Sequence, residues 1–533
     1  MKLIAALLTT LFFLSCSSEQ PSEETELLKP EYGGTLTYAK NGPAITMDPA
    51  IAREGESSIV ISNIYEGLIE QQAGKAGINP GLARSWDISE DGKTYTFHLR
   101  SGVQFHDGTP FNAEAVLLSF ERQRDPKNPY HRAGRFEFWD NLGMSNIISS
   151  WKAVDDSTVE FVLGSANPTF LNLLSLYVTS IVSPTALKKY GDDIERNPVG
   201  TGPFKFLSWS DDGVVTVIAN NDYWNGRPYL DTIIFKPIPS AKDRWKALKA
   251  GEIDMMAVPD QADIGDMDRT AGVKSAKQPG INICYMAMNM KKKPFDDLRI
   301  RQAIVYAINR EKLVRELYGQ LGRPAKNPIP PMLIGYNEEI RYTPYDPEKS
   351  KQLLKEAGYP KGFKAKLWTM PIIREYMPNG KLAAEIIQRD LKVVGIETEI
   401  YSGPTWKEHT DRISKGEHEL AIFGWIGDAP DPNFFFSPLL SSESANEVSA
   451  SNIAFYKSAK MDELIHKGIS VFDPVERSQI YKQGCELFNE DLPWFTIAHS
   501  VSIVPMAKYV QGFKLHSSSI RKFGKTWIQK DQR

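Results

Sequence analysis

A carboxylate and a large aromatic residue stand together in residues 419–436, ELAIFGWIGDAPDPNFFF. The apolar run 420–423 predicts a strand buried on both faces, and Gly424 predicts a turn directly after it. Open α/β sheets bind ligands beyond the carboxyl ends of their strands. On local pattern alone, a solvated Asp-Pro turn explains the same residues equally well. The candidate ligand contacts in this turn are Trp425, Ile426, Gly427 and Asp428.

Arg374 is a second candidate, because it also follows a predicted strand, at 364–370. A planar guanidinium binds a carboxylate through two parallel hydrogen bonds, and a carboxylate such as Asp428 is a suitable partner for an ammonium group. We expect Arg374 and Asp428 at the ends of two strands of one sheet. The alternative interpretations are a surface ion pair between Arg374 and Glu375, and an Asp428 that only caps a turn.

Other types of chemistry find little support in the sequence. Glu417-His418-Glu419 lacks the second histidine of a zinc protease motif, and no GxSxG, P-loop, CxxC or CxxCH pattern occurs. His98 and His106 flank a predicted hairpin strand, where a solvated or hydrogen-bonded histidine is a simpler interpretation than a metal ligand. We therefore expect no metal, no cofactor and no enzymatic activity. An exported hydrolase that uses a carboxylate in a cleft is the alternative from another class.

The N-terminus has the layout of an export signal. Residues 1–16, MKLIAALLTTLFFLSC, combine one positive charge with an apolar run too short to span a bilayer, and they end in Cys16. The last four residues resemble a lipobox, in which the cysteine is acylated; a plain secretory signal is the alternative. Residues 17–31 are polar and contain proline, which predicts a flexible tether. Acyl chains on Cys16 would hold the protein at a membrane surface.

The rest of the chain carries no net charge. The whole chain has a formal charge of -3; Lys2 is the only charge in the signal, and the tether holds five Glu and one Lys, so residues 32–533 sum to zero. A neutral body argues against nucleic-acid binding and against electrostatic docking to membranes. With 41% hydrophobic residues, a body of this length is expected to fold into two or three domains.

Two cysteines remain once Cys16 is assigned to the anchor. Cys284 lies in an apolar, strand-like run and Cys485 in a helical pattern. The spacing does not decide whether they pair, and two buried free thiols are the favoured interpretation over a disulfide.

Strands and helices alternate in the second half of the chain, which predicts an α/β domain with a largely parallel sheet. A hairpin is expected earlier, around Asp91-Gly92. The other expected elements are strands at 33–39, 364–370, 396–401, 419–423 and from about 498, and helices at 57–68, from 298, at 380–394 and at 405–414.

Several motifs, in order along the chain, resemble the family 5 extracytoplasmic solute-binding proteins of peptide ABC transporters. The segments that carry the resemblance are GLARSW at 81–86, DGKTYTFHLR at 91–100, GVQFHDG at 102–108, FNAEAV at 111–116, NPVGTGPF at 197–204, KPFDD at 293–297, RQA at 301–303, YDPEK at 345–349, Leu367-Trp368 and the 419–436 stretch. The second half is similar to the dipeptide receptors within this family.

This resemblance implies a two-lobed, class II periplasmic binding protein fold of the α/β class. The implied division is a signal peptide at 1–16, a tether at 17–31, lobe I at 32–288 with an inserted subdomain at about 65–203, lobe II at 289–499, and a return to lobe I at 500–533. Two crossovers, expected at 286–290 and 497–501, would act as hinges when the lobes close around a ligand.

The same resemblance implies a monomeric, lipid-anchored receptor in the periplasm or at the cell surface, which captures di- or oligopeptides and delivers them to a membrane permease. In the dipeptide receptors, the residues matching Arg374 and Asp428 bind the ligand carboxylate and amine. Tyr376, Trp425, Ile426 and Gly427 would be their neighbours in the pocket. Haem, glutathione or antimicrobial peptides are the alternative ligands within the family.

One residue departs from that pattern. The dipeptide receptors usually have proline where Glu375 stands, and a glutamate there is expected to pair with Arg374 in an empty cleft or to repel an acidic ligand. Asp431 is a rival for the amine contact, but the prolines on both sides of it favour a structural turn.

Overall fold

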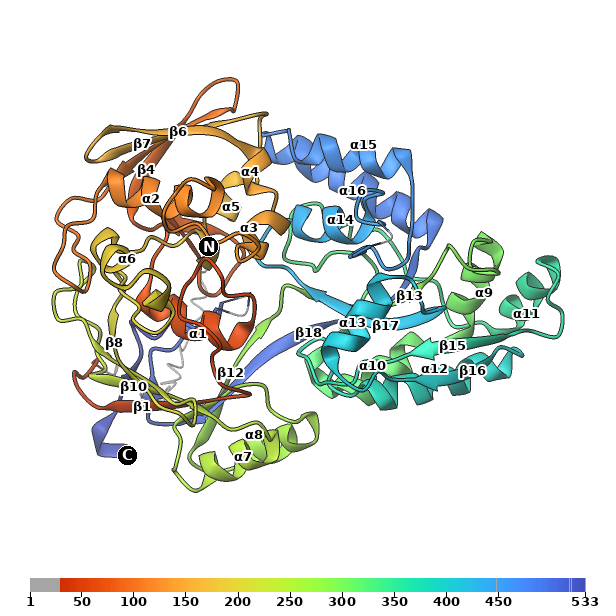
Figure 1. The fold of residues 1–533 in the computed structure, drawn as a ribbon. Helices are drawn as coiled ribbons and strands as arrows, with labels where there is room; N and C mark the ends of the chain where they lie inside the picture. Colours follow the sequence, from red (N-terminus) through yellow and green to blue (C-terminus); the bar gives the residue numbers. More distant parts are fainter. Residues whose placement is uncertain (1–28, 447, 517, 519, 533) are drawn as a thin grey trace, which may run out of the picture.

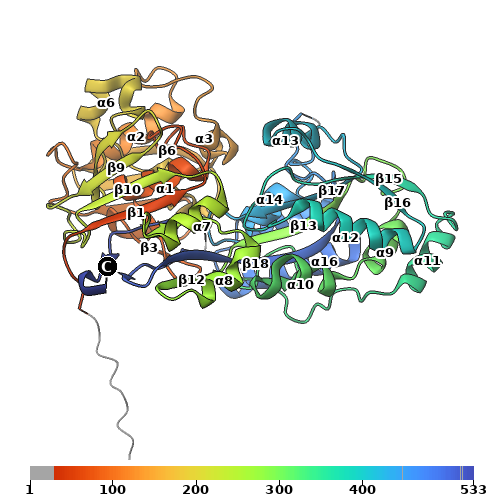
Figure 2. The same ribbon diagram turned by 90° about the horizontal axis from the view of Figure 1, so that it is seen from below.

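The computed structural model describes residues 29–446, 448–516, 518 and 520–532. The predicted signal peptide, with Cys16, and most of the tether lie outside these residues. The chain folds into two lobes that lie side by side (Figures 1 and 2).

One mixed sheet runs through both lobes and contains twelve strands of the described residues. In the first lobe they are β1 (Thr35–Lys40), β8 (Phe204–Trp209), β9 (Val215–Ala219), β10 (Thr232–Pro237), β11 (Met255–Met256) and β12 (Val273–Pro279). In the second lobe they are β13 (Asn282–Met288), β14 (Gly322–Pro324), β15 (Lys364–Trp368), β16 (Glu397–Tyr401) and β17 (Leu420–Ile426). The remaining strand, β18 (Trp494–Ala507), is shared by both lobes (Figure 2).

The change of lobe takes place at two adjacent points. The half of β18 from Val501 onward pairs with β12, whereas the half up to Ala498 pairs with β13. On the first crossover, the strands β12 and β13 are separated by Gly280 and Ile281, earlier than the 286–290 expected from sequence. The composition changes at this point from the polar residues 277–280, KQPG, to the apolar β13, which is buried along its whole length.

A separate four-stranded sheet lies in the first lobe, in the order β4 (Ala83–Ile88), β5 (Thr94–Leu99), β7 (Thr158–Leu163) and β6 (Ile148–Asp155). The predicted hairpin is confirmed: β4 and β5 are antiparallel, and Gly92 in the turn has a φ of +68°, which glycine adopts without strain. Tyr95, Phe97 and Leu99 alternate with polar residues and are buried. A small hairpin, β2 (Ile69–Gln71) and β3 (Ile78–Pro80), precedes this sheet.

Helices cover the sheets of both lobes (Figure 1). Those of the first lobe are α1 (Gly55–Ile64), α2 (Ala113–Arg124), α3 (Glu137–Asn141), α4 (Met144–Ile147), α5 (Phe170–Leu173), α6 (Pro184–Tyr190), α7 (Ala241–Lys249) and α8 (Ile264–Arg269). Those of the second are α9 (Leu298–Ala307), α10 (Arg310–Tyr318), α11 (Pro347–Glu356), α12 (Gly380–Val393), α13 (Trp406–Ser414), α14 (Asn433–Leu440), α15 (Ala459–Gly468) and α16 (Pro474–Asp491). A last strand pair, β19 (Val510–Gln511) and β20 (Trp527–Ile528), lies in the C-terminal segment.

The predicted helix ends in the second lobe are confirmed by their capping residues. The side chain of Asp297 accepts a hydrogen bond at the start of α9, and that of Thr405 does so at the start of α13. Gly395, just beyond α12, has a φ of +86°.

The second lobe differs from the sequence expectations in its strand directions and in the end of β17. The sheet is mixed rather than largely parallel: β16, β15 and β17 are parallel, but β13 and β18 are antiparallel to their neighbours. The prediction that the strand ends at Phe423 is also wrong, because Gly424 to Ile426 continue β17 by pairing with β13. Cys284 and Cys485 are buried free thiols, as favoured from the sequence.

Candidate functional site

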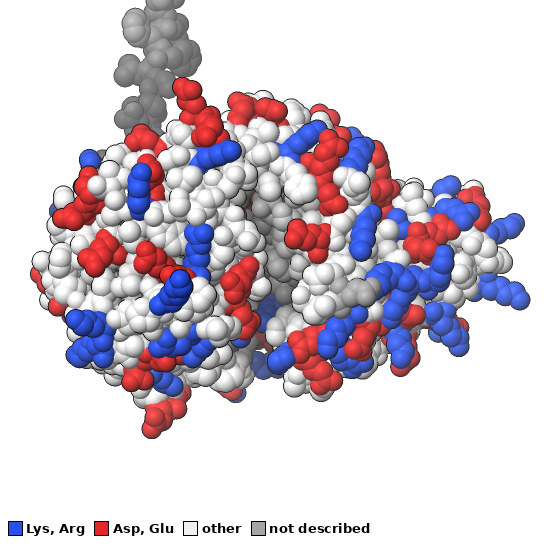
Figure 3. Space-filling model, turned by 45° about the horizontal axis from the view of Figure 1, so that its top comes forward, with Lys and Arg blue, Asp and Glu red and all other residues white. Residues whose placement is uncertain are grey.

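The two lobes enclose a deep hollow (Figure 3). A cavity of about 130 Å³ lies between them. From the second lobe it is lined by the loop after β17, namely Ile426, Gly427 and Asp428. From the first lobe it is lined by Arg53, Glu54, Gly55, Ser58, Gln71, Phe138, Leu176, Tyr177, Ser518 and Ile520. Three of the six residues predicted to contact a ligand therefore line a cavity that both lobes build.

Asp428 places an unpaired carboxylate in this cavity. Its side chain is exposed, but it faces the enclosed hollow between the lobes, and the surrounding protein raises the pKa of Asp428 to about 6 by desolvation. Among the described residues, none donates a hydrogen bond to its carboxylate oxygens. Its backbone oxygen accepts one from Nε2 of Gln71 at 2.7 Å. A desolvated anion without a partner favours a cationic ligand group at this point.

Arg374 lies in the loop after β15, the parallel neighbour of β17. Its guanidinium carbon is 5.1 Å from the ring centre of Trp406, and its backbone pairs with that of Met377. It lines a smaller cavity of about 30 Å³, together with residues of both lobes such as Val258 and Tyr318. The two predicted anchors thus stand at the ends of neighbouring strands, as expected, but each lines a different cavity.

The side chains of Trp425 and Tyr376 both make contacts within the protein. The indole nitrogen of Trp425 donates to the backbone oxygen of Phe434 at 2.7 Å. The buried ring of Tyr376 packs on Gly424, where a Cβ atom would approach the ring to 2.2 Å. Glycine is needed at this position because only a bare backbone leaves room for the ring. Their role as ligand contacts stays a prediction.

Glu375 does not pair with Arg374. Its carboxylate accepts a hydrogen bond from Ser502 Oγ at 3.0 Å and lies 3.3 Å from Nη2 of Arg521. Both partners belong to the first lobe, so the pairing could not be foreseen from residues near Glu375 in sequence. The alternative interpretation, an ion pair between Arg374 and Glu375, is therefore wrong.

Asp431 is fully engaged in the structure, which confirms the structural interpretation. Its two carboxylate oxygens bind Nη1 and Nη2 of Arg477 at 2.7 and 2.8 Å, and one of them also caps Asn433. Asn172 of the first lobe donates to Asp431 at 3.4 Å. With these partners, Asp431 has no capacity left for a ligand amine.

Sequence reasoning missed the first-lobe side of the cavity. Gln71 and Ser518 are far apart in sequence, yet Ser518 Oγ donates to Gln71 Oε1 at 2.7 Å, and Gln71 in turn holds the Asp428 loop. Single polar residues of this kind carry no local motif, so no signal in the sequence would have found them.

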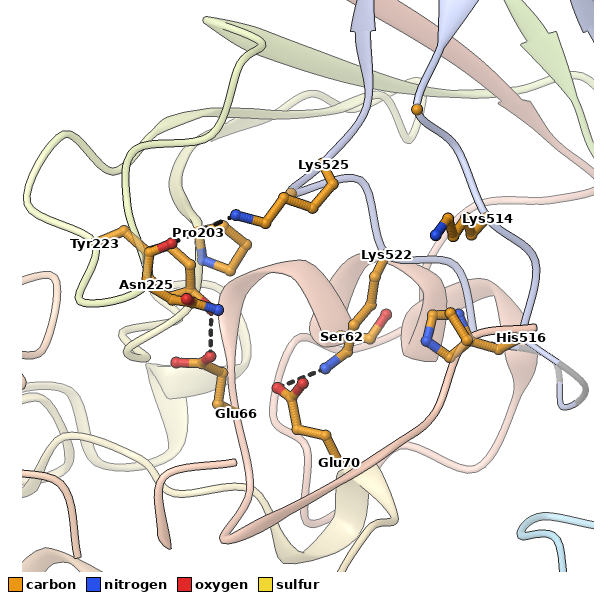
Figure 4. A pocket seen from close by; sticks show the side chains of 13 residues that line it. Ser62, Glu66, Glu70, Pro203, Tyr223, Asn225, Lys514, His516, Lys522 and Lys525 are labelled. Atoms are coloured by element: carbon orange, nitrogen blue, oxygen red, sulfur yellow. Dashed lines mark hydrogen bonds and ion pairs between the residues drawn. The ribbon is translucent and has the colours of Figure 1, made fainter. Parts of the chain in front are cut away.

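A larger cavity, of about 240 Å³, lies entirely within the first lobe (Figure 4). It is lined on one side by the buried Glu66, whose carboxylate accepts hydrogen bonds from Thr201, Tyr223 and Trp224, and on another by the ion pair of Glu70 with Lys522 at 2.8 Å. No described residue of the second lobe lines it, so lobe closure does not form it. We therefore take the cavity of about 130 Å³ that contains Asp428 as the candidate site.

Two further types of site are not found in the part of the chain that the structure describes. No group of three His, Cys, Asp or Glu side chains there is placed to hold a metal ion. Within the same residues, no helix combines the length and the apolar character needed to cross a bilayer.

Comparison with known proteins gives consistent results. The model of the bacterial extracellular solute-binding proteins, family 5, matches residues 77–447. The dipeptide-binding protein of Escherichia coli is 38% identical over 90% of this chain and 92% of its own length. The haem-binding protein A of Haemophilus influenzae is 37% identical over 94% of this chain and 93% of its own length.

Solved structures agree with this relationship. The ABC transporter-associated periplasmic binding protein DppA of Helicobacter pylori, in complex with the peptide STSA, is 36% identical and superimposes with a TM-score of 0.83 over 94% of this chain and 99% of its own. The match of sequence and fold over nearly the whole chain has one explanation: this chain belongs to the bacterial extracellular solute-binding proteins of family 5, and its fold is their two-lobed α/β fold.

Proposed function

We propose that this protein captures di- or oligopeptides outside the cytoplasmic membrane and delivers them to an ABC permease. The observation that carries the proposal is the unpaired, desolvated carboxylate of Asp428 in a cavity that both lobes build. The relatives of this protein include dipeptide-binding proteins, and one related structure is a complex with a peptide. In this function, Asp428 binds the peptide ammonium and Arg374 binds the terminal carboxylate, with Tyr376, Trp425, Ile426 and Gly427 around them.

The energetics of such a site follow from the charges of a free peptide. Enclosing an ammonium and a carboxylate removes both from water, so each needs an oppositely charged partner. Asp428 and Arg374 lie beyond neighbouring strands and line separate cavities, so a peptide that bridges them must also connect these cavities. Binding of the substrate without chemical change, as in a transport receptor, requires nothing more than these contacts and lobe closure.

Haem is a second candidate ligand, favoured by the relationship to the haem-binding protein A. Haem iron is bound in proteins by His, Cys, Met or Tyr side chains, and among the described residues that line the cavity Tyr177 alone is of these types. Its hydroxyl donates to the backbone oxygen of Ala52 at 3.2 Å, and burial raises the pKa of Tyr177 well above its usual value. Iron binds the ionised phenolate, which this environment disfavours, so the site supports a peptide better than haem. Glutathione, itself a peptide, and antimicrobial peptides remain as ligand variants to be tested.

Calorimetry on the protein from residue 17 onward tests the proposal, since this part contains all the described helices and strands. We expect a free dipeptide to bind tightly and its N-acetylated counterpart to bind at least about tenfold more weakly, because acetylation removes the ammonium. A tetrapeptide measures the length of the site. Equal binding of the free and acetylated peptides would contradict the role of Asp428. Turnover of the peptide would instead indicate a hydrolase.

The membrane anchor is part of the same proposal and rests on the sequence of residues 13–16, FLSC. If Cys16 is acylated, then Cys16→Ser is expected to release the protein from membranes or to leave the precursor uncleaved. Fractionation of cells, with detection of the protein in membrane and soluble fractions, measures this. A variant that is still processed and still bound to membranes would show that another signal holds it.

The proposed boundaries of the lobes follow those expected from the sequence, lobe I at 32–288 and 500–533 and lobe II at 289–499, except that β13 moves the start of lobe II forward to about residue 282. An inserted subdomain at about 65–203 contains the four-stranded sheet of β4 to β7. Limited proteolysis checks this division. Cleavage sites concentrated within 65–203, with the rest of the protein left folded, would support a separate inserted subdomain. Cleavage sites spread evenly along the chain would contradict it.

A further inference from the structure

Two side chains of the C-terminal segment connect the first lobe to both loops that carry the candidate anchors. Ser518 binds Gln71, which donates to the backbone oxygen of Asp428 at 2.7 Å. Arg521 lies 3.3 Å from the carboxylate of Glu375, the residue next to Arg374. The C-terminal segment therefore reaches both loops from the same lobe.

Arg521 itself is fixed to the first lobe. Its backbone oxygen accepts a hydrogen bond from the side chain of Asn63 at 2.7 Å, and the same asparagine accepts one from the backbone of Phe523 at 2.9 Å. Asn63 lies in α1 and is fully buried. The guanidinium is held as well, because its Nη1 donates to the backbone oxygens of Ser518 at 3.1 Å and Ile520 at 2.9 Å, so it moves with the first lobe and not with Glu375.

The ion pair is shielded from solvent. The side chain of Glu375 is 14% exposed and that of Arg521 is 6% exposed. The other hydrogen-bond partner of Glu375, Ser502, lies in the first-lobe half of β18 at 3.0 Å. Ser502 and Arg521 both belong to the first lobe, so separating the lobes must break these contacts and hydrate both charges. Screening by salt is weak for such a buried pair.

We propose that Glu375 and Arg521 form a latch that favours the closed arrangement of the lobes. The pair forms directly, without any ligand atom, so it acts before a ligand arrives as well as after. Glu375 is a positioning residue, because it fixes the loop of Arg374 in the closed form. This inference rests on the proposed function. In a peptide receptor, closure of the lobes increases ligand affinity, because the apparent affinity scales with the fraction of closed molecules.

Distance measurements between the lobes test the latch independently of any ligand. Spin labels are attached at Lys188→Cys in α6 and Lys355→Cys in α11, both exposed, in the protein from residue 17 onward. The two native thiols are buried, and burial raises the pKa of Cys284 to about 12, so they do not compete for the label. Pulsed EPR then gives the distribution of distances, with and without a dipeptide.

We expect Glu375→Gln to lower the population at the short, closed distance about threefold or more and to raise the peptide Kd by the same factor. Arg521→Gln should have the same effect, and the double variant should add little to either single change, because the pair acts as a unit. Ser502→Ala removes only a hydrogen bond and should have a smaller effect. It also keeps the test usable if Arg521→Gln does not fold.

Asp48→Asn is the matched control. It breaks the buried pair of Asp48 with Arg122, at 2.6 Å, which lies within the first lobe. It should lower stability and leave the distance distribution unchanged. Identical distributions for the unmodified protein and Glu375→Gln, in both conditions, would overturn the latch. A shifted distribution in a protein that binds no peptide would keep the latch and reject the proposed ligand.

Discussion

Asp428→Asn is expected to weaken the binding of a free dipeptide by about 2 kcal/mol or more, which is about thirtyfold in Kd, while the fold stays intact. The substitution keeps the size of the side chain and removes its charge. Because no described residue pairs with this carboxylate, its loss leaves no protein cation unpaired. The measurement is a calorimetric titration, with circular dichroism as the check of the fold.

Asp411→Asn is the matched control, since Asp411 is an acidic residue of the second lobe whose partner is Lys407 and which does not line the cavity. It should leave peptide affinity unchanged. Unchanged affinity in Asp428→Asn as well would remove Asp428 from the site.

The pH dependence provides a second readout for the same carboxylate. With the pKa of Asp428 at about 6 in the ligand-free protein, peptide affinity should be full above about pH 7 and fall about tenfold by pH 5, where the carboxyl is protonated. Asp428→Asn should not show this decrease. For stability the sign is the reverse: between about pH 4 and 6 the folded state binds more protons than the unfolded state, so the contribution of Asp428 to stability decreases as pH rises.

Arg477→Met is expected to lower the free energy of unfolding by about 3 to 5 kcal/mol. The guanidinium is buried, binds both oxygens of Asp431, and also donates to the backbone oxygen of Gly468 at 2.6 Å and to Thr169 at 3.1 Å. Its removal leaves the carboxylate of Asp431 buried and without a counter-charge. Urea denaturation followed by fluorescence measures the effect.

The exposed pair of Lys467 with Glu463, at 2.7 Å on α15, supplies the comparison. Lys467→Met should change stability by less than about 1 kcal/mol, because both side chains are hydrated in either state. The double variant Arg477→Met with Asp431→Leu should recover part of the loss, since no buried charge then remains. A small effect of Arg477→Met alone would mean that water reaches Asp431.

Local sequence patterns determined much of the second lobe. The caps at Asp297 and Thr405, the stop at Gly395 and the order of strands and helices all follow from side chains that act on neighbouring backbone groups. The hairpin at Gly92 follows for the same reason, because alternation and turn residues act over a few positions. The end of β17 did not follow, since its last residues are held by pairing with β13, which is distant in sequence.

The sequence by itself also determined the family and named Asp428, because the loop after a strand end belongs to one segment of chain. The tertiary structure alone decided what faces that loop. Gln71, which Ser518 supports, and Arg521 reach the second lobe from segments far away in the chain, and Glu375 pairs with Arg521 rather than with its neighbour Arg374. Contacts across a cleft depend on how two lobes are placed, and no pattern within either segment encodes that placement.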